Sequence, residues 1–561
     1  MKKYFLSIIA VFISSILFAA NPEGKIKINI MMKAQSDANE LNRMADVLPT
    51  KAKRRDFVVN YLKNHAAESQ NDLLKYLNVL EINGVVENIR PLWIVNSVSC
   101  YAEEWLIAEL EQRDDVLSVY RVEELQLTDN DNVVYQIGRN DSREIAENVT
   151  MVNAHLVWEL GYTGEDVLVA IIDTGVKLTH ADLQGRFWDG GADYPNHGYD
   201  FASHDNDPTD ENGHGTHVAG TICGTGTSGT QTGVAPGAKL MVLKVFDGDT
   251  QSDATILVEA MQFAVEHGAD LMNMSLGWPN PEPEVKLLYR QACENTLAAG
   301  VVAAVCAGNI RHMQSMVPIP KNIYSPGDCP PPYLHEDQLV NAGGTSCVIS
   351  VGAVDFNDEI TYFSSEGPST WTDVALYNDY PYTSGSTTEI GLIRPDVCAP
   401  GLNIKSLDFN TDNGYTCMDG TSMATPCVAG TIALMLSKDH ELTPEHIDEI
   451  LERTAIPLSA HKNNDFGSGR IDAFAAVNAI GDDGVGEAAD DSCYTVYPNP
   501  ANDFITIVET FPETSQISII NIHGQLMNIR VIGNQIDVSN LPDGVYLIKI
   551  DDKSQKIVVV R

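Results

Sequence analysis

The chain of 561 residues is poor in basic side chains: 36 Lys and Arg stand against 77 Asp and Glu, which gives a formal net charge of −41. Binding to nucleic-acid phosphates or to an anionic membrane surface requires clustered Lys and Arg. We therefore expect neither nucleic acid nor such a membrane surface as a partner. The acidic balance fits a soluble protein, and it leaves the polarity of any binding pocket open.

The chain also lacks internal repeats and low-complexity stretches. Beyond residue 20 it has no run of the roughly 18 to 20 apolar residues that a membrane-spanning helix needs, so we expect no transmembrane segment in the mature chain. The apolar run within residues 1–20 follows Lys2 and Lys3 and ends at Ala19-Ala20. This pattern predicts a signal peptide that is cleaved near Ala20, and hence export.

Cysteine is not abundant: ten are present, and most of them lie between Cys223 and Cys427. Cysteines of an exported chain can form disulfides. Cys329 and Cys347 bracket a proline-rich loop and are the one pair that we predict. Cys306 and Cys427 lie within apolar segments, which favours buried thiols.

Residues 21–127 alternate short apolar runs with amphipathic stretches, which predicts a small α+β domain. The expected strands are 25–32, 85–98 and 116–122, and the expected helices are 57–80 and 102–111. Residues 128–147 are polar and rich in Asp and Asn, which is typical of an exposed linker.

From residue 148 to 480 the pattern changes to short apolar runs separated by helical stretches and Gly-rich turns. These runs are 167–172, 240–245, 271–274, 301–305 and 349–354. Strands that are apolar throughout belong to a parallel sheet with helices on both faces, so we predict an α/β fold. Functional side chains in such a fold stand at the carboxyl ends of the strands.

Residues 481–492 form a second linker, rich in Asp and Gly. Residues 493–561 contain short alternating runs at 504–508, 517–520 and 545–550, separated by turn residues. This spacing predicts a small β-sandwich.

Asp173-Thr174-Gly175 follows the first apolar run of the α/β segment. A carboxylate held at a strand end can orient an imidazole and stabilise its charged form. Aspartic proteases also use Asp-Thr-Gly, but their mechanism needs two carboxylates that share a proton. We find no second Asp-Thr-Gly or Asp-Ser-Gly on a comparable strand end, so Asp173 is predicted to serve a histidine.

Residues 212–221 read NGHGTHVAGT and place His214 at the start of a helix of small residues. Such a helix can pack closely beneath a site, and His214 is the predicted general base. His214 and His217 are three residues apart, which leaves a zinc pair as the alternative. The Glu of a His-Glu-x-x-His site is absent.

Gly420-Thr421-Ser422 places a serine in the first turn of an apolar helix. The helix N-terminus and the Ser422 N–H favour a developing oxyanion, although a serine there can also be a simple N-cap. Asn309 follows the 301–305 run after Ala307-Gly308 and can donate to the same oxyanion; an Asn after Gly can also be only a turn. The order Asp, His, Asn, Ser along one α/β segment favours catalysis.

Together these motifs resemble the subtilase family over roughly residues 152–479. The resemblance implies that Ser422 attacks the scissile carbonyl, that His214 transfers the proton and that Asp173 holds the imidazole tautomer. Asn309 and the Ser422 amide would bind the oxyanion. The pocket for the primary substrate side chain would be lined by Ser275, Leu276, Gly277, Ala307 and Gly308, and the substrate would pair as an added strand.

Extra sequence at 311–345 and 370–393 borders this pocket and leaves the preferred side chain unpredicted. The chemistry needs no cofactor, but family members hold Ca²⁺ as a structural ion. Asp182 resembles a calcium ligand, although the companion loop 225–229 lacks the family's asparagines. A second acidic stretch resembles the calcium loop of thermitase-like members, with a solvated loop as the alternative; it contains Asp200, Asp205, Asp207 and Asp210.

Residues 21–127 resemble the ferredoxin-like propeptide of this family, an intramolecular chaperone and inhibitor. That implies self-cleavage between Glu124 and about Glu147. An unrelated N-terminal binding domain is the alternative.

The C-terminal segment, with YPNP at 497–500 and LPDGVY at 541–546, resembles the sorting domains of type IX secretion. This implies a Gram-negative source and passage through the periplasm to the medium or the outer surface. A carbohydrate- or protein-binding sandwich is the alternative.

The sequence therefore predicts a secreted serine endopeptidase that acts on proteins or peptides and is made as a self-processing zymogen. The competing hypothesis is a catalytically dead subtilase scaffold that serves as a surface binding module. All four catalytic positions, the propeptide and the export signal agree with each other, which favours the enzyme. We expect a monomer.

Overall fold

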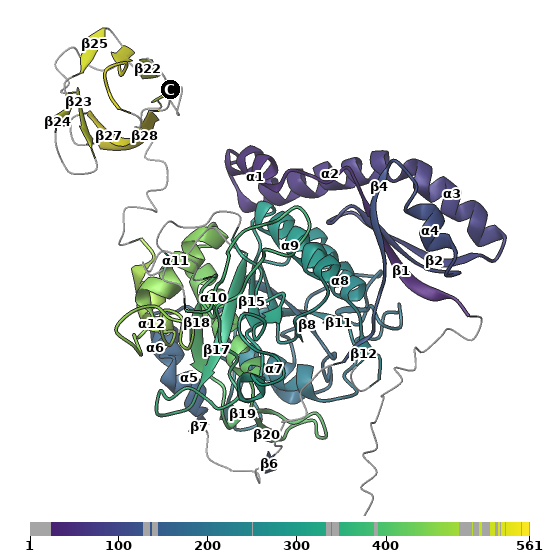
Figure 1. Cartoon of the computed structure of the whole chain (residues 1–561). Coiled ribbons are helices and arrows are strands. Elements are labelled where there is room, and N and C mark those ends of the chain that lie inside the picture. Colours follow the sequence, from purple (N-terminus) through teal and green to yellow (C-terminus); the bar gives the residue numbers. More distant parts are fainter. Residues whose placement is uncertain are drawn as a thin grey trace, which may run out of the picture. The chain divides into compact units, whose positions relative to one another are not determined.

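The computed structural model divides the chain into two compact units, Met1–Ile480 and Gly481–Arg561 (Figure 1). In the first unit it describes residues 24–126, 135–136, 144–248, 251–331, 338, 347–385 and 391–480. In the second it describes 481, 496–497, 504–507, 517–521, 526–527, 529–532, 535–542, 544–550 and 553–559. The predicted signal peptide and most of the two predicted linkers lie outside these residues.

The N-terminal segment of the first unit is a four-stranded antiparallel sheet with the strand order β2-β3-β1-β4. Its elements follow each other as β1 (Ile26–Met32), α1 (Ala38–Asp46), α2 (Lys51–Ser69), α3 (Asn71–Ile82), β2 (Val86–Leu92), β3 (Ser97–Ala102), α4 (Leu106–Leu110) and β4 (Val116–Arg121). With the helices counted as two crossovers, this βαββαβ order is the ferredoxin-like arrangement.

Two predictions for this segment were wrong in detail. Residues 85–98, expected as one strand, form the β2–β3 hairpin, whose turn ends at Asn96 with φ of 41°. The expected helix 57–80 is two helices, because α2 ends at Ser69 and α3 begins at Asn71. The turn at 93–96 and the helix boundary at Gln70 contain no Gly, so the sequence did not mark either one as a break.

The centre of the first unit is a seven-stranded sheet with the order β18-β17-β15-β13-β8-β11-β9, in which every pairing is parallel. The strands are β8 (Leu168–Asp173), β9 (Gly198–Asp200), β11 (Lys239–Lys244), β13 (Leu271–Met274), β15 (Val302–Cys306), β17 (Val348–Val354) and β18 (Val397–Pro400). The predicted parallel α/β sheet is confirmed.

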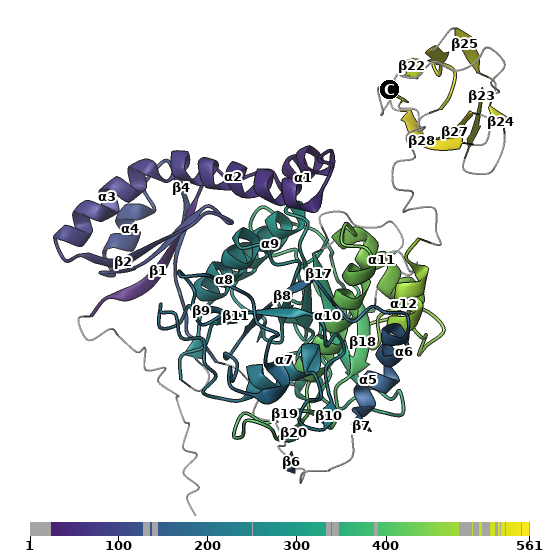
Figure 2. The same ribbon diagram turned by 180° about the vertical axis from the view of Figure 1, so that it is seen from behind.

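Each face of this sheet is covered by helices (Figures 1 and 2). Val169 and Ile171 of β8 join a core with α7 (His214–Cys223), α10 (Thr421–Lys438), α11 (Pro444–Thr454) and α12 (Ala473–Ala479). The alternate residues Ala170 and Ile172 join a second core with α8 (Ala254–Glu266) and α9 (Pro283–Ala298). Because both faces are buried, most positions of the central strands are apolar, with exceptions such as Asn273 of β13 and Ser350 of β17.

The N-terminal segment lies on the outer side of α8 and α9 and shares their core through side chains such as Leu41, Val58 and Leu62. Arg54 of α2 makes one of the polar contacts across this boundary. Its guanidinium donates to the carbonyls of Leu297 (3.1 Å) and Ala298 (2.8 Å) at the end of α9. A cation at this position satisfies terminal carbonyls and complements the helix dipole.

Three short strands between the N-terminal segment and α5 (Glu147–Met151) each pair with a strand of the peptidase elements. β5 (Leu125–Gln126) pairs antiparallel with β12 (Gln251–Ser252). β6 (Tyr135–Gln136) pairs with β20 (Tyr415–Met418), and β7 (Glu144–Ile145) pairs with β10 (Thr230–Gln231). The described parts of the predicted linker therefore add edge strands instead of being wholly exposed.

The second unit contains two four-stranded sheets, β21-β22-β26-β25 and β24-β23-β27-β28. Their strands are β21 (Val496–Tyr497), β22 (Phe504–Ile507), β23 (Ile517–Asn521), β24 (Leu526–Met527), β25 (Arg530–Ile532), β26 (Gln535–Asp537), β27 (Gly544–Ile550) and β28 (Lys553–Val559). Ile505 and Ile536 of the first sheet and Ile519 and Ile548 of the second share one apolar core. Among the described residues of the whole chain, no helix is both long and apolar enough to span a bilayer.

Candidate active site

Asp173 is the last residue of β8, at the carboxyl edge of the central sheet. Its Oδ1 accepts a bond from the Thr174 N–H (2.8 Å) and lies 2.7 Å from Nδ1 of His214. Burial raises the pKa of the Asp173 carboxyl, and the neighbouring His214 partly offsets that effect. The carboxylate fixes the imidazole with Nδ1 turned towards it, which leaves Nε2 as the nitrogen that can exchange a proton with substrate.

His214 is the first residue of α7, and the helix packs tightly on the Asp173-Thr174-Gly175 turn. A Cβ at Gly215 would lie 2.1 Å from the carbonyl oxygen of Gly175, so only glycine permits this approach. The absence of a side chain at Gly215 therefore allows α7 to approach closely enough for His214 to contact Asp173.

His217, the other member of the alternative zinc pair, lies elsewhere. Its Nε2 is 2.9 Å from the carbonyl oxygen of Ile404, and burial lowers the pKa of its imidazole to about 3. In the described part of the chain, no three His, Cys, Asp or Glu side chains gather so that they could hold a metal ion. His217 is therefore a neutral structural residue, and the zinc alternative loses its second ligand.

Asp210 joins the two catalytic elements, a role that sequence reasoning missed. Its Oδ1 accepts from Thr174 Oγ1 (3.0 Å) and from the N–H groups of Asn212 and Gly213 (both 2.9 Å). Its Oδ2 accepts from the N–H of Thr216 (3.0 Å) and from its hydroxyl. One buried carboxylate thus fastens the turn after Asp173 to the first turn of the His214 helix. The signal available in the sequence was an Asp four residues before the histidine.

Ser422 is the second residue of α10, directly after Gly420-Thr421. Its hydroxyl donates to the carbonyl of Ser275 (3.1 Å), and the hydroxyl of Ser275 donates to the carbonyl of Ser422 (2.8 Å). This exchange ties the start of α10 to the segment after β13. The serine therefore stands at a helix N-terminus, where the backbone N–H and the helix dipole stabilise negative charge.

Asn309 has a fixed side-chain orientation beside this serine. Its Oδ1 accepts from the N–H and from the hydroxyl of Thr421 (both 2.9 Å). Because the carboxamide oxygen takes both bonds, the amino group is held on the other side, 3.4 Å from the position of a Cβ on Gly420. An amide donor next to the Ser422 N–H is the arrangement that an oxyanion hole requires.

The five residues predicted to bind substrate follow two neighbouring parallel strands. Ser275, Leu276 and Gly277 follow β13, and Ala307 and Gly308 follow β15, with Met274 and Val305 paired in register. The Leu276 side chain is buried in the core with α8 and α9. The two segments therefore end beside Ser422 and Asn309, respectively.

A model of the subtilase family matches residues 164–471. The chain belongs to the subtilase family. This subtilase is 31% identical to Bacillopeptidase F of Bacillus subtilis (strain 168) over 498 residues, which is 84% of the chain but 31% of that relative. It is 32% identical to Subtilisin DY of Bacillus licheniformis over 335 residues, 60% of the chain and 99% of that relative. Subtilisin E of Bacillus subtilis (strain 168) is 30% identical over 68% of the chain and 81% of its own length.

A second family model, of a secretion system C-terminal sorting domain, matches residues 495–560. The subtilase is thus a subtilisin-like serine peptidase with a type IX sorting tail, which indicates secretion. The chain spans less than a third of Bacillopeptidase F, so that relative's other parts have no counterpart in the alignment.

The predicted calcium residues of the subtilase do not fit a calcium site in the described structure. Asp182 is buried, and its two oxygens accept from the Ser228 N–H and the Tyr415 hydroxyl (both 2.7 Å). Asp200 accepts from two backbone N–H groups and pairs with Lys244 at 3.2 Å. Asp205 and Asp207 each cap the residue two positions on. With Asp210 engaged as described, these carboxylates bond to the chain itself and do not converge.

The predicted disulfide of the subtilase is not formed in the structure: Cys329 and Cys347 are buried free thiols. Cys329 and Cys347 lie in the same core as Cys293, and the Cys293 thiol neighbours both of them. Cys306 and Cys427 are buried within β15 and α10, as predicted.

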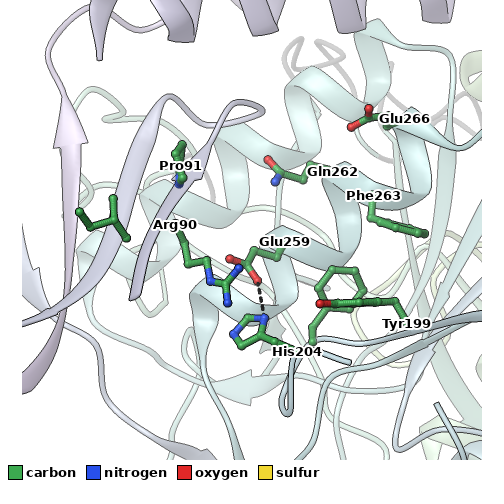
Figure 3. A pocket seen from close by; sticks show the side chains of 10 residues that line it. Arg90, Pro91, Tyr199, His204, Glu259, Gln262, Phe263 and Glu266 are labelled. Atoms are coloured by element: carbon green, nitrogen blue, oxygen red, sulfur yellow. Dashed lines mark ion pairs between the residues drawn. The ribbon is translucent and has the colours of Figure 1, made fainter. Parts of the chain in front are cut away.

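A pocket of about 260 Å³ lies between the N-terminal segment and the peptidase elements (Figure 3). Ile89, Arg90 and Pro91 of β2 line one side, and His204, Glu259 and Phe263 lie on the other. Burial raises the pKa of Glu259 to about 7, against the opposing pull of Lys27 and Arg90. The pKa of His204, whose Nδ1 is 3.9 Å from Glu259 Oε2, is lowered to about 4 by burial and by the same two cations.

Proposed function

We propose that the chain is a secreted serine endopeptidase that hydrolyses peptide bonds through an acyl-enzyme. The single observation that carries this is the Asp173–His214 pair, 2.7 Å apart at the sheet edge, together with Ser422 at the start of α10 and Asn309 fixed beside it.

Ser422 Oγ attacks the carbonyl carbon of the scissile bond and passes its proton to Nε2 of His214. The Asn309 amide and the Ser422 N–H donate to the oxyanion, and Asp173 stabilises the imidazolium. When the C–N bond breaks, His214 gives the proton to the leaving amine. A water molecule, deprotonated by the same nitrogen, then releases the acyl group and restores Ser422. The chemistry requires no cofactor.

The N-terminal segment is proposed to be the propeptide, an intramolecular chaperone and inhibitor. It covers α8 and α9, and its last described strand, β5, pairs with the edge strand β12 as an extended substrate would. Self-cleavage is expected between Glu124 and about Glu147, a stretch that includes this pairing and the residues after it.

The proposed partners are protein or peptide substrates and, during export, the type IX secretion machinery. We expect the product to be released or held at the outer surface of a Gram-negative cell, and to act as a monomer. The sorting-domain match supports this route.

Mass spectrometry of the secreted protein, beside a Ser422→Ala variant, tests the proposal. The wild type should lose its N-terminal segment and take up a fluorophosphonate on Ser422. The Ser422→Ala protein should remain at full length and unlabelled, because removal of the nucleophile abolishes both reactions.

The competing function is a dead scaffold that binds a surface partner. It would be supported if both proteins were processed alike by another protease and neither took up the label. In that case the catalytic proposal fails, whatever the fold.

A further inference from the structure

The slot between the ends of β13 and β15 is occupied by the side chain of Tyr324. A Cβ placed on Gly308 would lie 2.5 to 2.8 Å from three atoms of the Tyr324 ring. A Cβ placed on Gly277 would lie 2.9 Å from Tyr324 Cβ and 3.5 Å from its Cδ2. The tyrosine thus lies in van der Waals contact with the backbone of both glycines, which face each other across the slot.

Tyr324 is held in this position by its own backbone. Its N–H donates to the carbonyl of Ala307 (2.9 Å), and its carbonyl accepts from the N–H of Asp328 (2.9 Å). β16 (Tyr324–Ser325) also pairs antiparallel with β14 (Trp278–Pro279), directly after Gly277. Bonds to both walls therefore fix the residue, and its side chain is only 3% exposed.

This slot is the place where the side chain before the scissile bond, P1, must go. Gly308 directly precedes Asn309, and Ser275 exchanges hydrogen bonds with Ser422. A peptide whose carbonyl carbon lies at Ser422 Oγ, with its oxygen towards Asn309, places its P1 Cβ between the two glycine segments. The space there is already filled by an aromatic ring.

We infer that Tyr324 closes the primary specificity pocket and restricts P1 to small side chains such as Gly, Ala, Ser and Thr. The inference rests on the proposed function and names the substrate class of that same site. An aromatic or long aliphatic P1 side chain would have to displace a ring that the surrounding backbone holds. Interiors resist such overpacking because they are already dense.

The same closure constrains self-processing. The chain leaves the β5–β12 pairing at Gln126, and the next residues are Leu127 and then TDNDNVV at 128–134. A small P1 residue first occurs at Thr128. Among residues 128–134 only Thr128 belongs to this class, so self-cleavage is expected after Thr128 and the mature N-terminus should be Asp129.

The experiment compares peptides that differ only at P1, Ala against Phe, on wild type and on Tyr324→Ala, Tyr324→Phe and Tyr362→Ala. Wild type should favour P1 Ala in kcat/KM by about 100-fold, the scale on which a pocket rejects a group that it cannot hold. Tyr324→Ala should reduce this ratio at least about 10-fold by opening the slot. Tyr324→Phe keeps the ring and should keep the ratio. Tyr362→Ala removes a tyrosine that is 56% exposed and serves as the control.

Fluorophosphonate labelling separates the two claims. If no protein labels, the proposed function fails. If the wild type labels but cleaves P1 Phe as well as P1 Ala, or self-cleaves after Leu127 or Tyr135, the inference is overturned even though the enzyme stands. An unchanged P1 Ala to P1 Phe ratio in a labelled Tyr324→Ala protein overturns the inference as well. If Tyr324→Ala does not fold, the P1 preference of the wild type and its mature N-terminus test the inference alone.

Discussion

Asp210 shows how much one buried carboxylate contributes to the placement of a catalytic pair. It accepts five hydrogen bonds from the residues on either side of the Asp173–His214 contact. Hydrogen bonds to a charged group contribute more than neutral ones, and a buried donor left without its acceptor is costly. The acidic stretch before His214 therefore serves the positioning of the histidine through its last member.

Asp210→Asn should lower the free energy of unfolding by about 2 kcal/mol, because the amide turns donors towards N–H groups that need an acceptor. Denaturant unfolding of the Ser422→Ala precursor measures this. Asp207→Asn, at an exposed carboxylate of the same loop, should change stability by less than about 0.5 kcal/mol. Equal effects of the two substitutions would contradict the role given to Asp210.

Asp210→Asn should also slow fluorophosphonate labelling, measured in proteins that retain Ser422 and compared with the wild type. The readout separates positioning from mere stability, because labelling is measured under conditions where both proteins are folded.

At the scale of elements, the contact between β2 and α8 encloses Glu259, whose pKa is raised, and His204, whose pKa is lowered. Glu259 of α8 faces Lys27 of β1 and Arg90 of β2, while Asp253, which caps α8, and His204 complete its surroundings. Burial favours the neutral form of both Glu259 and His204. Between about pH 4 and 7 their contributions to stability therefore change in opposite directions and partly cancel.

Substitution of Glu259 separates its contribution to stability from that of His204. The pKa of Glu259 is raised to about 7 from an ordinary 4.5, so its favourable neutral form is fully present below pH 4.5 and is lost as the pH rises to 7. Glu259→Gln should therefore stabilise the Ser422→Ala precursor by up to about 3 kcal/mol at pH 8 relative to pH 4.5, at roughly 1.4 kcal/mol per pKa unit. Denaturant titrations at the two pH values check this. An identical effect at both would show that the carboxyl is not perturbed by the contact.

The residues proposed for catalysis could be located in the sequence because each stands in a short motif beside an apolar run, and the structure brings these motifs to one edge of the sheet. Tyr324 could not, since its contacts with Gly277 and Gly308 depend on how a long insertion folds back between two strands. The acidic residues suggested calcium because composition does not reveal that backbone N–H groups already occupy the carboxylates. The β2–β3 turn was missed because Asn96, not Gly, adopts the positive φ there.

At the scale of the molecule, each of the two units has an apolar core of its own among the residues that the structure describes. The two cores around the central sheet contain residues up to Ile480, and the core of the β-sandwich contains only residues from Ile505 onwards. Because each unit has its own buried apolar side chains, we expect the peptidase unit to fold without the sorting domain.

Removal of residues 482–561 should therefore leave a protein that still labels with fluorophosphonate but does not leave the cell. Fractionation of the native host, with the full-length protein as the control, measures the distribution. We expect the truncated form in the periplasm and the full-length form in the medium or at the outer surface. Truncated protein in the medium at the full-length level would show that the C-terminal unit has another role.

The pairing of β5 with β12 has a consequence for the timing of activity. While the linker is intact, the strand β5, proposed to belong to the inhibitory propeptide, and its partner β12 belong to one molecule, so β5 experiences an effective concentration in the millimolar range that dilution does not change. Once the linker is cut, the contact becomes an association of two molecules and weakens as they diffuse apart. On the proposed propeptide role, we expect latency to depend on confinement: the cut enzyme should remain inhibited in the crowded periplasm and gain activity as it is diluted away from the cell.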